Sequence, residues 1–166
     1  MGSRTSWWAR KARQFGTHLT ARVSDGERRA VAAWTRPAEL ALFDTMHVAD
    51  RRHGLDTVAG LRRRGVTDRD VLVAGLLHDC AKGDTGVLPR VAWSLGQAFG
   101  PSVVGLAGRV PGWRPQLDRL AVHADASADA LAAIGLPERA VELVRHQDNP
   151  VDPEYGRIFR AADEAA

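Results

Sequence analysis

The chain has 166 residues, of which 45% are hydrophobic and 26% are charged, and its formal net charge at pH 7 is +3. This length and composition are typical of one globular domain with a buried core. They exclude a protein that crosses the membrane by helices, because no apolar run approaches the roughly 18 residues that a transmembrane helix needs. The first residues also lack the features of a secretory signal. We therefore expect a cytoplasmic protein without a membrane span.

The cysteine content limits the kinds of site that the chain can build. Cys80 is the only cysteine, so no intramolecular disulfide can form and zinc sites of the CxxC type are excluded. We interpret Cys80 as a small buried residue that fills part of the core. Any metal site must therefore use histidine and carboxylate ligands.

Positive charge is concentrated at the start of the chain. Residues 1–36 carry eight Lys or Arg residues against Asp25 and Glu27, a balance of +6, so the remainder has a balance of −3. A basic segment can bind nucleic acid or an anionic membrane surface, but an ordinary solvated helix face has the same composition. We favour the solvated face and expect no nucleic-acid binding. The sequence thus predicts a basic helical extension over residues 1–36 and one domain over residues 37–166.

Hydrophobic residues recur with a helical period along nearly the whole chain. Pro37 suits the first turn of a helix, and Gly65 suits the left-handed cap that ends one. Thr67 or Asp68 is expected to cap the following helix. The predicted helices cover residues 5–16, 26–34, 37–49, 50–64, 68–77, 87–99, 116–134 and 137–147, and a short last helix begins near residue 154.

Glycine and proline mark the loops between these helices. The clearest loop is "GRVPGWRP" at residues 108–115, and "DNPVDPE" at residues 148–154 is a second. No segment shows the alternation of a strand, and there is no tandem repeat. The sequence therefore predicts an all-α fold, a compact single-domain bundle of about seven to nine helices.

One apolar run ends in a pair of polar residues that can do chemistry. The stretch "VAGLLHDCAKGD" ends its apolar part in His78 and Asp79, and Lys82 follows three residues later. His53 lies on the helix before this pair, and three further candidates follow it: His123, His146 and Asp163. We interpret the remaining histidines, His18 and His47, as ordinary surface or core residues.

Imidazole and carboxylate side chains from separate helices can hold divalent ions inside a bundle. Imidazole suits Zn, Fe, Co and Ni, and carboxylate adds Mg and Mn, so the identity of the metal stays open. One carboxylate can bridge two ions, and such a centre polarises a phosphoryl oxygen and lowers the pKa of a bound water. The chain contains no P-loop, no dinucleotide-binding fingerprint and no serine elbow.

Four segments resemble the HD-domain superfamily of metal-dependent phosphohydrolases. They are "DRRHGLDTVAGLRRRG", "DVLVAGLLHDCAKGD", "HADASADALAAIGLPERAVELVRHQ" and "FRAADE", and the resemblance covers about residues 40–166. It implies an HD-domain-like metal-binding helical domain with one or two divalent ions. The ligands that it implies for the first ion are His53, His78, Asp79 and Asp163.

The resemblance also implies a second ion, bridged to the first by Asp79 and held by His123 and His146. The chain departs from the family pattern at two positions. Ala81 stands where a glycine is usual, and Gln147 stands where two-metal relatives often have a further histidine. The second departure weakens the case for a second ion more than for the first.

The activity that the resemblance implies is hydrolysis of a phosphomonoester or phosphodiester, with a nucleotide as the expected substrate, by attack of a metal-activated water. Asp79 and Lys82 are the expected catalytic residues. Lys82, Arg51 and Arg52 are candidates for contact with the substrate phosphate. An ordinary cation at a helix end is the alternative interpretation of Lys82.

Two alternatives to a phosphohydrolase remain open at this stage. The first is a catalytically degenerate HD-type module that binds a ligand or a partner. The second is a di-iron oxygenase of the same superfamily, which the histidine-rich second site permits. The sequence leaves the substrate and the oligomeric state open as well.

Overall fold

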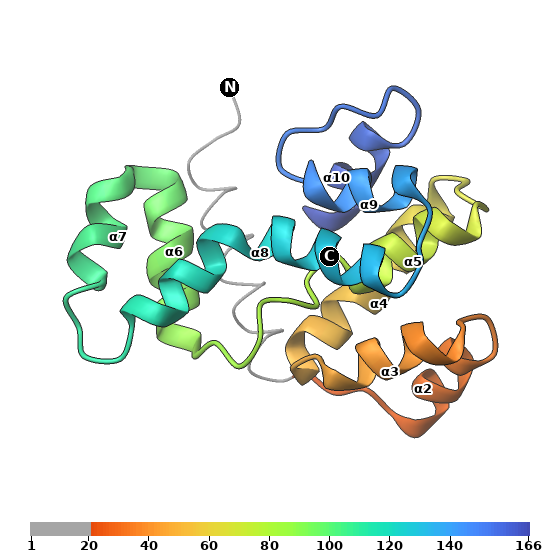
Figure 1. Ribbon diagram of the computed structural model, residues 1–166, viewed down its shortest axis with the longest axis horizontal. Coiled ribbons are helices and arrows are strands. Elements are labelled where there is room, and N and C mark those ends of the chain that lie inside the picture. The colour runs from red at the N-terminus through yellow and green to blue at the C-terminus, as the bar shows by residue number, and fades with distance from the viewer. Residues whose placement is uncertain (1–20) are drawn as a thin grey trace.

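The computed structural model describes residues 21–166, and within that range the chain is built from helices and contains no strand (Figure 1). The predicted helix over residues 5–16 lies outside the described residues. The predicted all-α bundle is confirmed. The helices are α2 (Asp25–Ala32), α3 (Pro37–Thr45), α4 (Val48–Arg63), α5 (Arg69–Leu77), α6 (Val87–Phe99), α7 (Pro101–Ala107), α8 (Arg114–Ala133), α9 (Glu138–Arg145) and α10 (Gly156–Asp163).

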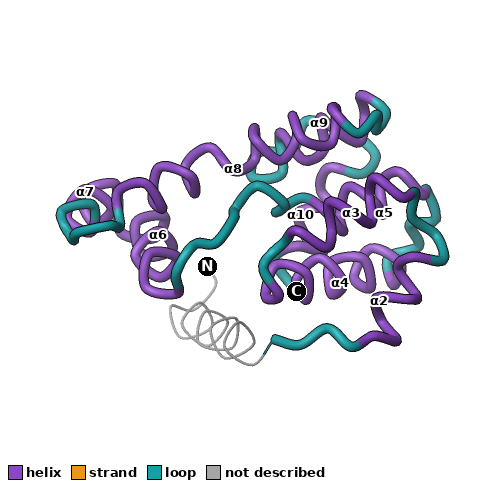
Figure 2. Tube along the Cα trace, turned by 60° about the horizontal axis from the view of Figure 1, so that its bottom comes forward, coloured by secondary structure: helices purple, strands orange, loops and turns teal. Residues whose placement is uncertain are grey.

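The helices form two lobes that α8 connects. In Figure 1, α6 and α7 lie on the left, away from the cluster of α2, α3, α4, α5, α9 and α10. Helix α8 packs on α6 in one lobe and on α9 and α5 in the other, and Figure 2 shows it running between them. The segment from His78 to Gly86 makes the second connection, because it joins α5 to α6.

Helix α5 is the centre of the larger lobe. Every residue from Val71 to Leu77 is buried, as expected of a helix that is apolar on all sides. Around it pack α3, α4, α8 and α9, and Phe43, Leu61 and Phe159 are the largest side chains of this core. Because α5 is surrounded on all sides, the residues that follow it, His78 and Asp79, are also buried.

Glycine allows α4 and α5 to approach closely. A Cβ atom at Gly54 would lie 2.2 Å from the backbone oxygen of Leu76, a distance that no real Cβ atom tolerates. The two backbones are therefore in contact at this crossing. Since Gly54 follows His53 and Leu76 precedes His78 by two residues, the crossing also brings the two imidazoles together, with ring centroids 5.1 Å apart.

Two helix boundaries differ from the sequence prediction. The helix expected over residues 37–49 ends at Thr45, because Met46 is extended and His47 caps α4 by accepting a hydrogen bond from the Ala49 amide at 3.2 Å. The extra helix α7 was not predicted. Gly100, with φ of 106°, turns the chain, and Pro101 then occupies the first turn of a helix, as proline readily does.

The described part of the predicted N-terminal extension packs on the domain. Ser24 and Glu27 form a capping box at the start of α2, and Val31 from the same helix is buried in the core. Glu27 also forms an ion pair with Arg52 of α4. Residues 21–36 therefore pack together with the helices of residues 37–166, whereas residues 1–20 lie outside the described range.

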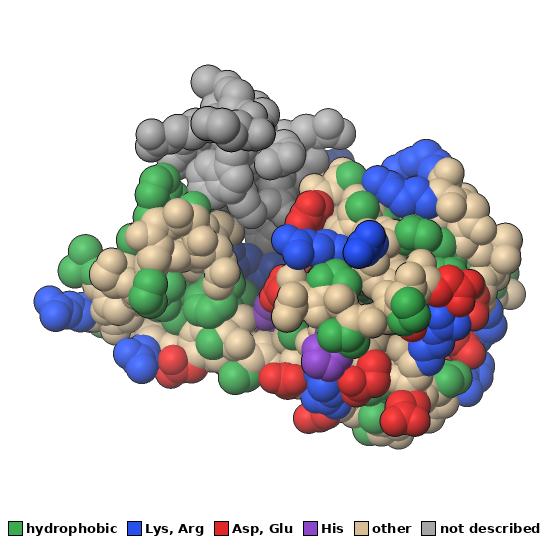
Figure 3. All heavy atoms as spheres, turned by 90° about the horizontal axis from the view of Figure 1, so that it is seen from above, with side chains coloured by type: hydrophobic (Ala, Val, Ile, Leu, Met, Phe, Trp, Pro, Cys, Tyr) green, Lys and Arg blue, Asp and Glu red, His purple; other side chains and the backbone are tan. Residues whose placement is uncertain are grey.

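The two lobes differ in their surface. Figure 3 shows side chains of both charges over the larger lobe, whereas hydrophobic side chains gather on the left, over α6 and α7. Leu88, Leu106 and Val110 are among the exposed hydrophobic residues of that lobe. Within residues 21–166, no helix combines the length and the apolar character needed to cross a membrane.

Candidate metal centre

Three of the predicted ligands meet at one point inside the larger lobe. His53 comes from α4, His78 from the C-terminal end of α5 and Asp163 from the last residue of α10. One donor atom from each lies within 4.8 Å of the others. The Oδ1 atom of Asp163 is 2.7 Å from Nε2 of His53 and 3.1 Å from Nε2 of His78. Residues far apart in the sequence thus converge on a single carboxylate oxygen.

Hydrogen bonding fixes the orientation of His78. Its Nδ1 atom lies 2.9 Å from the carbonyl oxygen of Gly75, and because a carbonyl can only accept, Nδ1 carries a proton. Nε2 then faces Asp163 Oδ1 at 3.1 Å and Asp79 Oδ2 at 3.5 Å. An imidazole whose outer nitrogen is bonded to a backbone carbonyl and whose inner nitrogen faces carboxylates is the usual arrangement of a metal-ligating histidine.

Asp79 is surrounded by basic groups. The side chain is 2% exposed, and Lys82 donates a hydrogen bond to Oδ2 at 2.5 Å. Nε2 of His53 is 3.9 Å from the same oxygen, and Nε2 of His123 is 3.7 Å from Oδ1. This buried carboxylate is therefore within 4 Å of Lys82, His53, His78 and His123.

The pKa values follow from these contacts. Burial alone would lower the pKa of His78, but the charges of Asp79 and Asp163 outweigh it and raise the pKa to about 9. Burial alone would raise the pKa of the Asp79 carboxyl, but the neighbouring His78 and Lys82 hold it well below its usual range. The pKa of Asp163 is also lowered, because His78 and His53 outweigh the effect of burial. The centre therefore holds two ionised carboxylates, whose charge is balanced by the neighbouring His78 and Lys82.

His123 lies at the edge of the centre and is bonded to Gln147. Its Nδ1 atom donates to the carbonyl of Leu120 at 2.6 Å, and its Nε2 atom lies 3.2 Å from the amide nitrogen of Gln147. Burial and the nearby Lys82 lower the pKa of His123, so the ring is neutral and its Nε2 accepts the hydrogen bond. Sequence reasoning noted Gln147 only as a departure from the family pattern.

The structure does not bring His146 into the centre. The side chain is 39% exposed, and its Nε2 lies 3.2 Å from Glu142 on the same face of α9. Of the six predicted ligands, the structure thus gathers His53, His78, Asp79 and Asp163 at the centre and His123 at its edge. His146 lies outside this group.

The predicted phosphate-binding cations have different environments. Lys82 contacts the centre through Asp79, and although burial opposes it, that carboxylate raises the pKa of Lys82. Arg52 is instead paired with Glu27 and Asp56 on the outer side of α4, which argues against a role for it in the centre. Arg51 contributes to lowering the pKa of Asp44, after the larger effect of Arg28. Within residues 21–166, neither arginine forms a hydrogen bond or ion pair with the expected ligand residues.

An ion pair that sequence reasoning missed supports the loop after Lys82. Arg90 donates to both oxygens of Asp50, at 2.6 and 2.8 Å, and also to the carbonyls of Thr85 and Gly83. Asp50 is one turn before His53 on α4 and is buried. The loop that carries Lys82 is therefore tied to the helix that carries His53. The i,i+3 spacing of Asp50 and His53 could have indicated that Asp50 faces the centre. Nothing in the local sequence around Arg90 indicates that it pairs with Asp50.

Arg119 is a second residue that the sequence analysis missed. It lies on α8 one turn before His123, and its guanidinium donates to the carbonyl of Asp84 at 3.4 Å. A charge this close to the Lys82 loop can attract a phosphate. Only its i,i+4 spacing from His123 could have indicated it.

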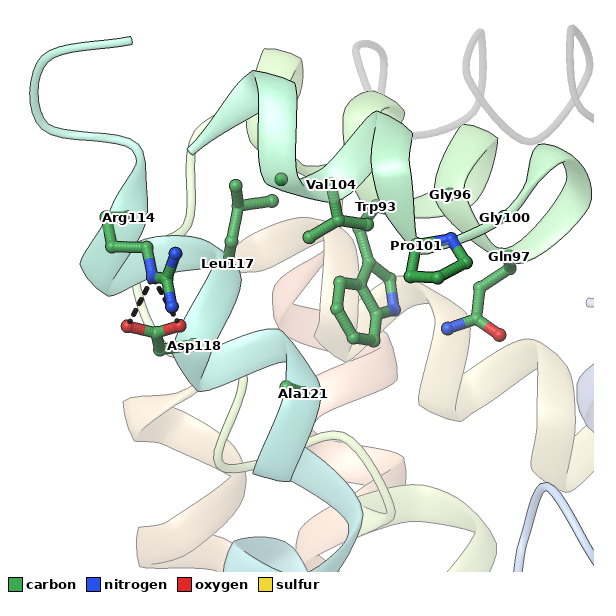
Figure 4. Close-up of a pocket in the computed structure, with 11 residues that line it drawn as sticks. Trp93, Gly96, Gln97, Gly100, Pro101, Val104, Arg114, Leu117, Asp118 and Ala121 are labelled. Atoms are coloured by element: carbon green, nitrogen blue, oxygen red, sulfur yellow. Dashed lines mark hydrogen bonds and ion pairs between the residues drawn. The ribbon is translucent and has the colours of Figure 1, made fainter. Parts of the chain in front are cut away.

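The structure also contains a pocket of about 500 Å³ in the smaller lobe (Figure 4). Trp93, Val104 and Leu117 line it, and the ion pair of Arg114 with Asp118 lies at its edge. Positions 114, 117, 118 and 121 share one face of α8, and positions 119 and 123 lie on the other. The pocket is therefore separate from the metal centre.

Comparison of the chain with family models, with curated proteins and with solved structures gives no match.

Proposed function

We propose that the protein is a metal-dependent phosphohydrolase that acts on a phosphomonoester or phosphodiester. The observation that carries this proposal is the orientation of His78, whose proton-bearing Nδ1 is bonded to Gly75 while Nε2 faces Asp163 and Asp79. The resemblance to HD-domain proteins favours a nucleotide as the substrate. The proposed metal ligands are His53, His78 and Asp163, with Asp79 beside them.

The donor set of the centre fits a divalent first-row metal ion. Two imidazole nitrogens and a carboxylate oxygen lie within 4.8 Å of one another, and this mixture suits Mn, Fe, Co, Ni or Zn, with Mg also served by the carboxylates. When bound, such an ion would polarise a phosphoryl oxygen and lower the pKa of a water. The proposal therefore requires no further cofactor.

Other residues of the chain would bind and orient the substrate. Asp79 stays ionised at neutral pH because its pKa is lowered, so it can accept a hydrogen bond from the attacking water. The side chain of Lys82 is 22% exposed, and its ammonium can donate to a phosphate oxygen as well as to Asp79. Arg119, one turn from His123 on α8, supplies a second cation near the same loop.

Phosphate release from a panel of nucleotides with Mn²⁺, Co²⁺, Fe²⁺ or Ni²⁺ tests the proposal. The Asp163→Asn variant should lose turnover by about 100-fold or more, because it replaces the carboxylate on which both imidazoles converge by a neutral amide. Asp125→Asn is the matched control, since Asp125 is exposed and paired with Arg145 away from the centre.

Two outcomes would count against the proposal. The first is a purified protein that binds metal but hydrolyses no phosphoester, which would favour the ligand-binding module. The second is turnover that needs no metal and survives in Asp163→Asn.

A further inference from the structure

The geometry points to a centre for one divalent ion. The side-chain amide of Gln147 is hydrogen-bonded to Nε2 of His123, the nitrogen that a second ion would need. This inference rests on the metal centre of the proposed function and adds the number of ions that the chain binds. It contradicts the two-ion arrangement that the resemblance to HD-domain proteins implies. The residues that decide it are His123, His146 and Gln147.

The first argument is the number of suitable donor groups. Within residues 21–166, only His53, His78 and Asp163 form a group of three or more His, Cys, Asp or Glu side chains with donor atoms close enough to hold an ion. Neither His123 nor His146 belongs to such a group. A second ion would therefore have fewer protein ligands than the first.

The second argument is the hydrogen bond on His123. Its Nδ1 proton is given to the carbonyl of Leu120 at 2.6 Å, which leaves Nε2 as the only nitrogen with a free lone pair. That lone pair faces the amide nitrogen of Gln147 at 3.2 Å. Gln147 is 4% exposed, so it is held there by packing. An amide N–H that points at this position repels a cation.

The third argument is the position of His146. It pairs with Glu142 at 3.2 Å and is 39% exposed, so it does not supply the second imidazole that an ion beside His123 would need. Of the residues expected to hold the second ion, this leaves Nε2 of His123 and Oδ1 of Asp79, which are 3.7 Å apart. Metal sites in proteins commonly use at least three protein ligands, and two donors next to a repelling amide fall short of that.

Rotation of the Gln147 amide would not restore a strong second site. It would present Oε1, which has no hydrogen-bond partner in the structure. An amide oxygen suits Mg²⁺ or Mn²⁺ better than Co²⁺, which prefers imidazole. Co²⁺ is therefore the ion that best distinguishes one site from two.

The test is the number of Co²⁺ ions bound per chain, measured by titration calorimetry and by elemental analysis after desalting. We expect one ion in the unmodified protein. Two ions would overturn the inference but leave the proposed function standing, whereas none would remove the metal centre on which both depend.

Two neighbouring substitutions make the test sharper. Gln147→His replaces the amide by an imidazole beside His123 and Asp79, so the count should rise to two. His146→Gln is the matched control, and its count should stay at one, because residue 146 faces Glu142. A folded Gln147→His protein that still binds one ion, or loss of an ion in His146→Gln, would contradict the inference.

Discussion

The contact between α4 and α5 at Gly54 provides the most direct test of how the fold builds the centre. Replacement of Gly54 by alanine places a Cβ atom 2.2 Å from the Leu76 carbonyl oxygen and 3.1 Å from its carbonyl carbon. Both atoms belong to a backbone at the centre of the core, so they cannot rotate away as a flexible side chain would. Ordinary van der Waals contact begins at 3.4 Å, so the two helices must separate by about 1.2 Å.

The Gly54→Ala substitution has opposite effects on helix α4 itself, which alanine stabilises, and on the packing of α4 against α5, which the added methyl group disrupts. Alanine is favoured over glycine in a helix by about 1 kcal/mol. Overpacking of a core typically costs about 1–3 kcal/mol and occasionally more. Because rigid backbone atoms collide here, we expect a cost near the upper end of that range, so that Gly54→Ala destabilises the protein by about 2 kcal/mol once the gain in helix propensity is subtracted. Since metal–ligand distances tolerate only about 0.2 Å, the shift of His53 should also weaken metal binding by about 10- to 100-fold.

Urea denaturation and metal titration of the same variant measure these two effects. Gly105→Ala is the matched control, because Gly105 lies inside α7 and a Cβ atom there would have no neighbour within 4 Å. The same substitution should therefore stabilise the protein there, by up to about 1 kcal/mol. A Gly54→Ala protein that is as stable as the original and binds metal equally well would refute the close-approach argument.

Three further predictions concern charged residues. Glu39 is fully buried, but its hydrogen bonds to Arg69 and Arg36 outweigh the effect of burial and lower its pKa. The ionised carboxylate therefore stabilises the fold above about pH 4.5, and this stabilisation is lost as the pH falls through the folded-state pKa. Glu39→Gln should cost about 1–3 kcal/mol in urea denaturation at neutral pH, and a loss that is the same at acidic pH would contradict this. Arg90→Ala leaves Asp50 buried without its partner, so the free energy of unfolding should fall by about 3 kcal/mol. Hydrogen exchange of the backbone amides of residues 83–86 should also become faster, and unchanged exchange would argue against a role of Arg90 in holding this loop. Arg119→Ala should raise the KM for a phosphorylated substrate roughly fivefold, about 1 kcal/mol for an exposed ion pair, whereas the control Arg114→Ala should leave KM unchanged.

Most helices could be predicted from the sequence because their signals are local. Asp68 accepts hydrogen bonds from the backbone at the start of α5, and Gly65 has the left-handed φ of 85° that a helix cap requires. The break at Met46 could not be predicted, because the apolar spacing continues past it. Tertiary packing, which puts His47 at the start of α4, decides that boundary.

The arginines beside His53 show where reading by proximity in the sequence fails. Arg52 precedes His53 directly, but successive residues on a helix are rotated by about 100°. Arg52 therefore points toward Glu27 on α2. Asp50 lies three residues before His53 and shares its face, which is why it reaches the loop of Lys82 through Arg90. Helical spacing would have selected Asp50 as the residue that shares the face of His53, although it could not have identified Arg90 as the partner of Asp50.

The same rule explains why Gln147, and not His146, lies beside His123. The buried face of α9 is formed by Ala140, Val141, Leu143 and Val144. Position 147, two residues past the end of α9, lies four residues after Leu143 and three after Val144, so it continues this face. Position 146 continues instead from Glu142, which is half exposed. The apolar pattern thus assigns the inward position before any contact is known. A histidine in the motif can serve as a ligand only where the helix turns it inward, and here that position holds an amide.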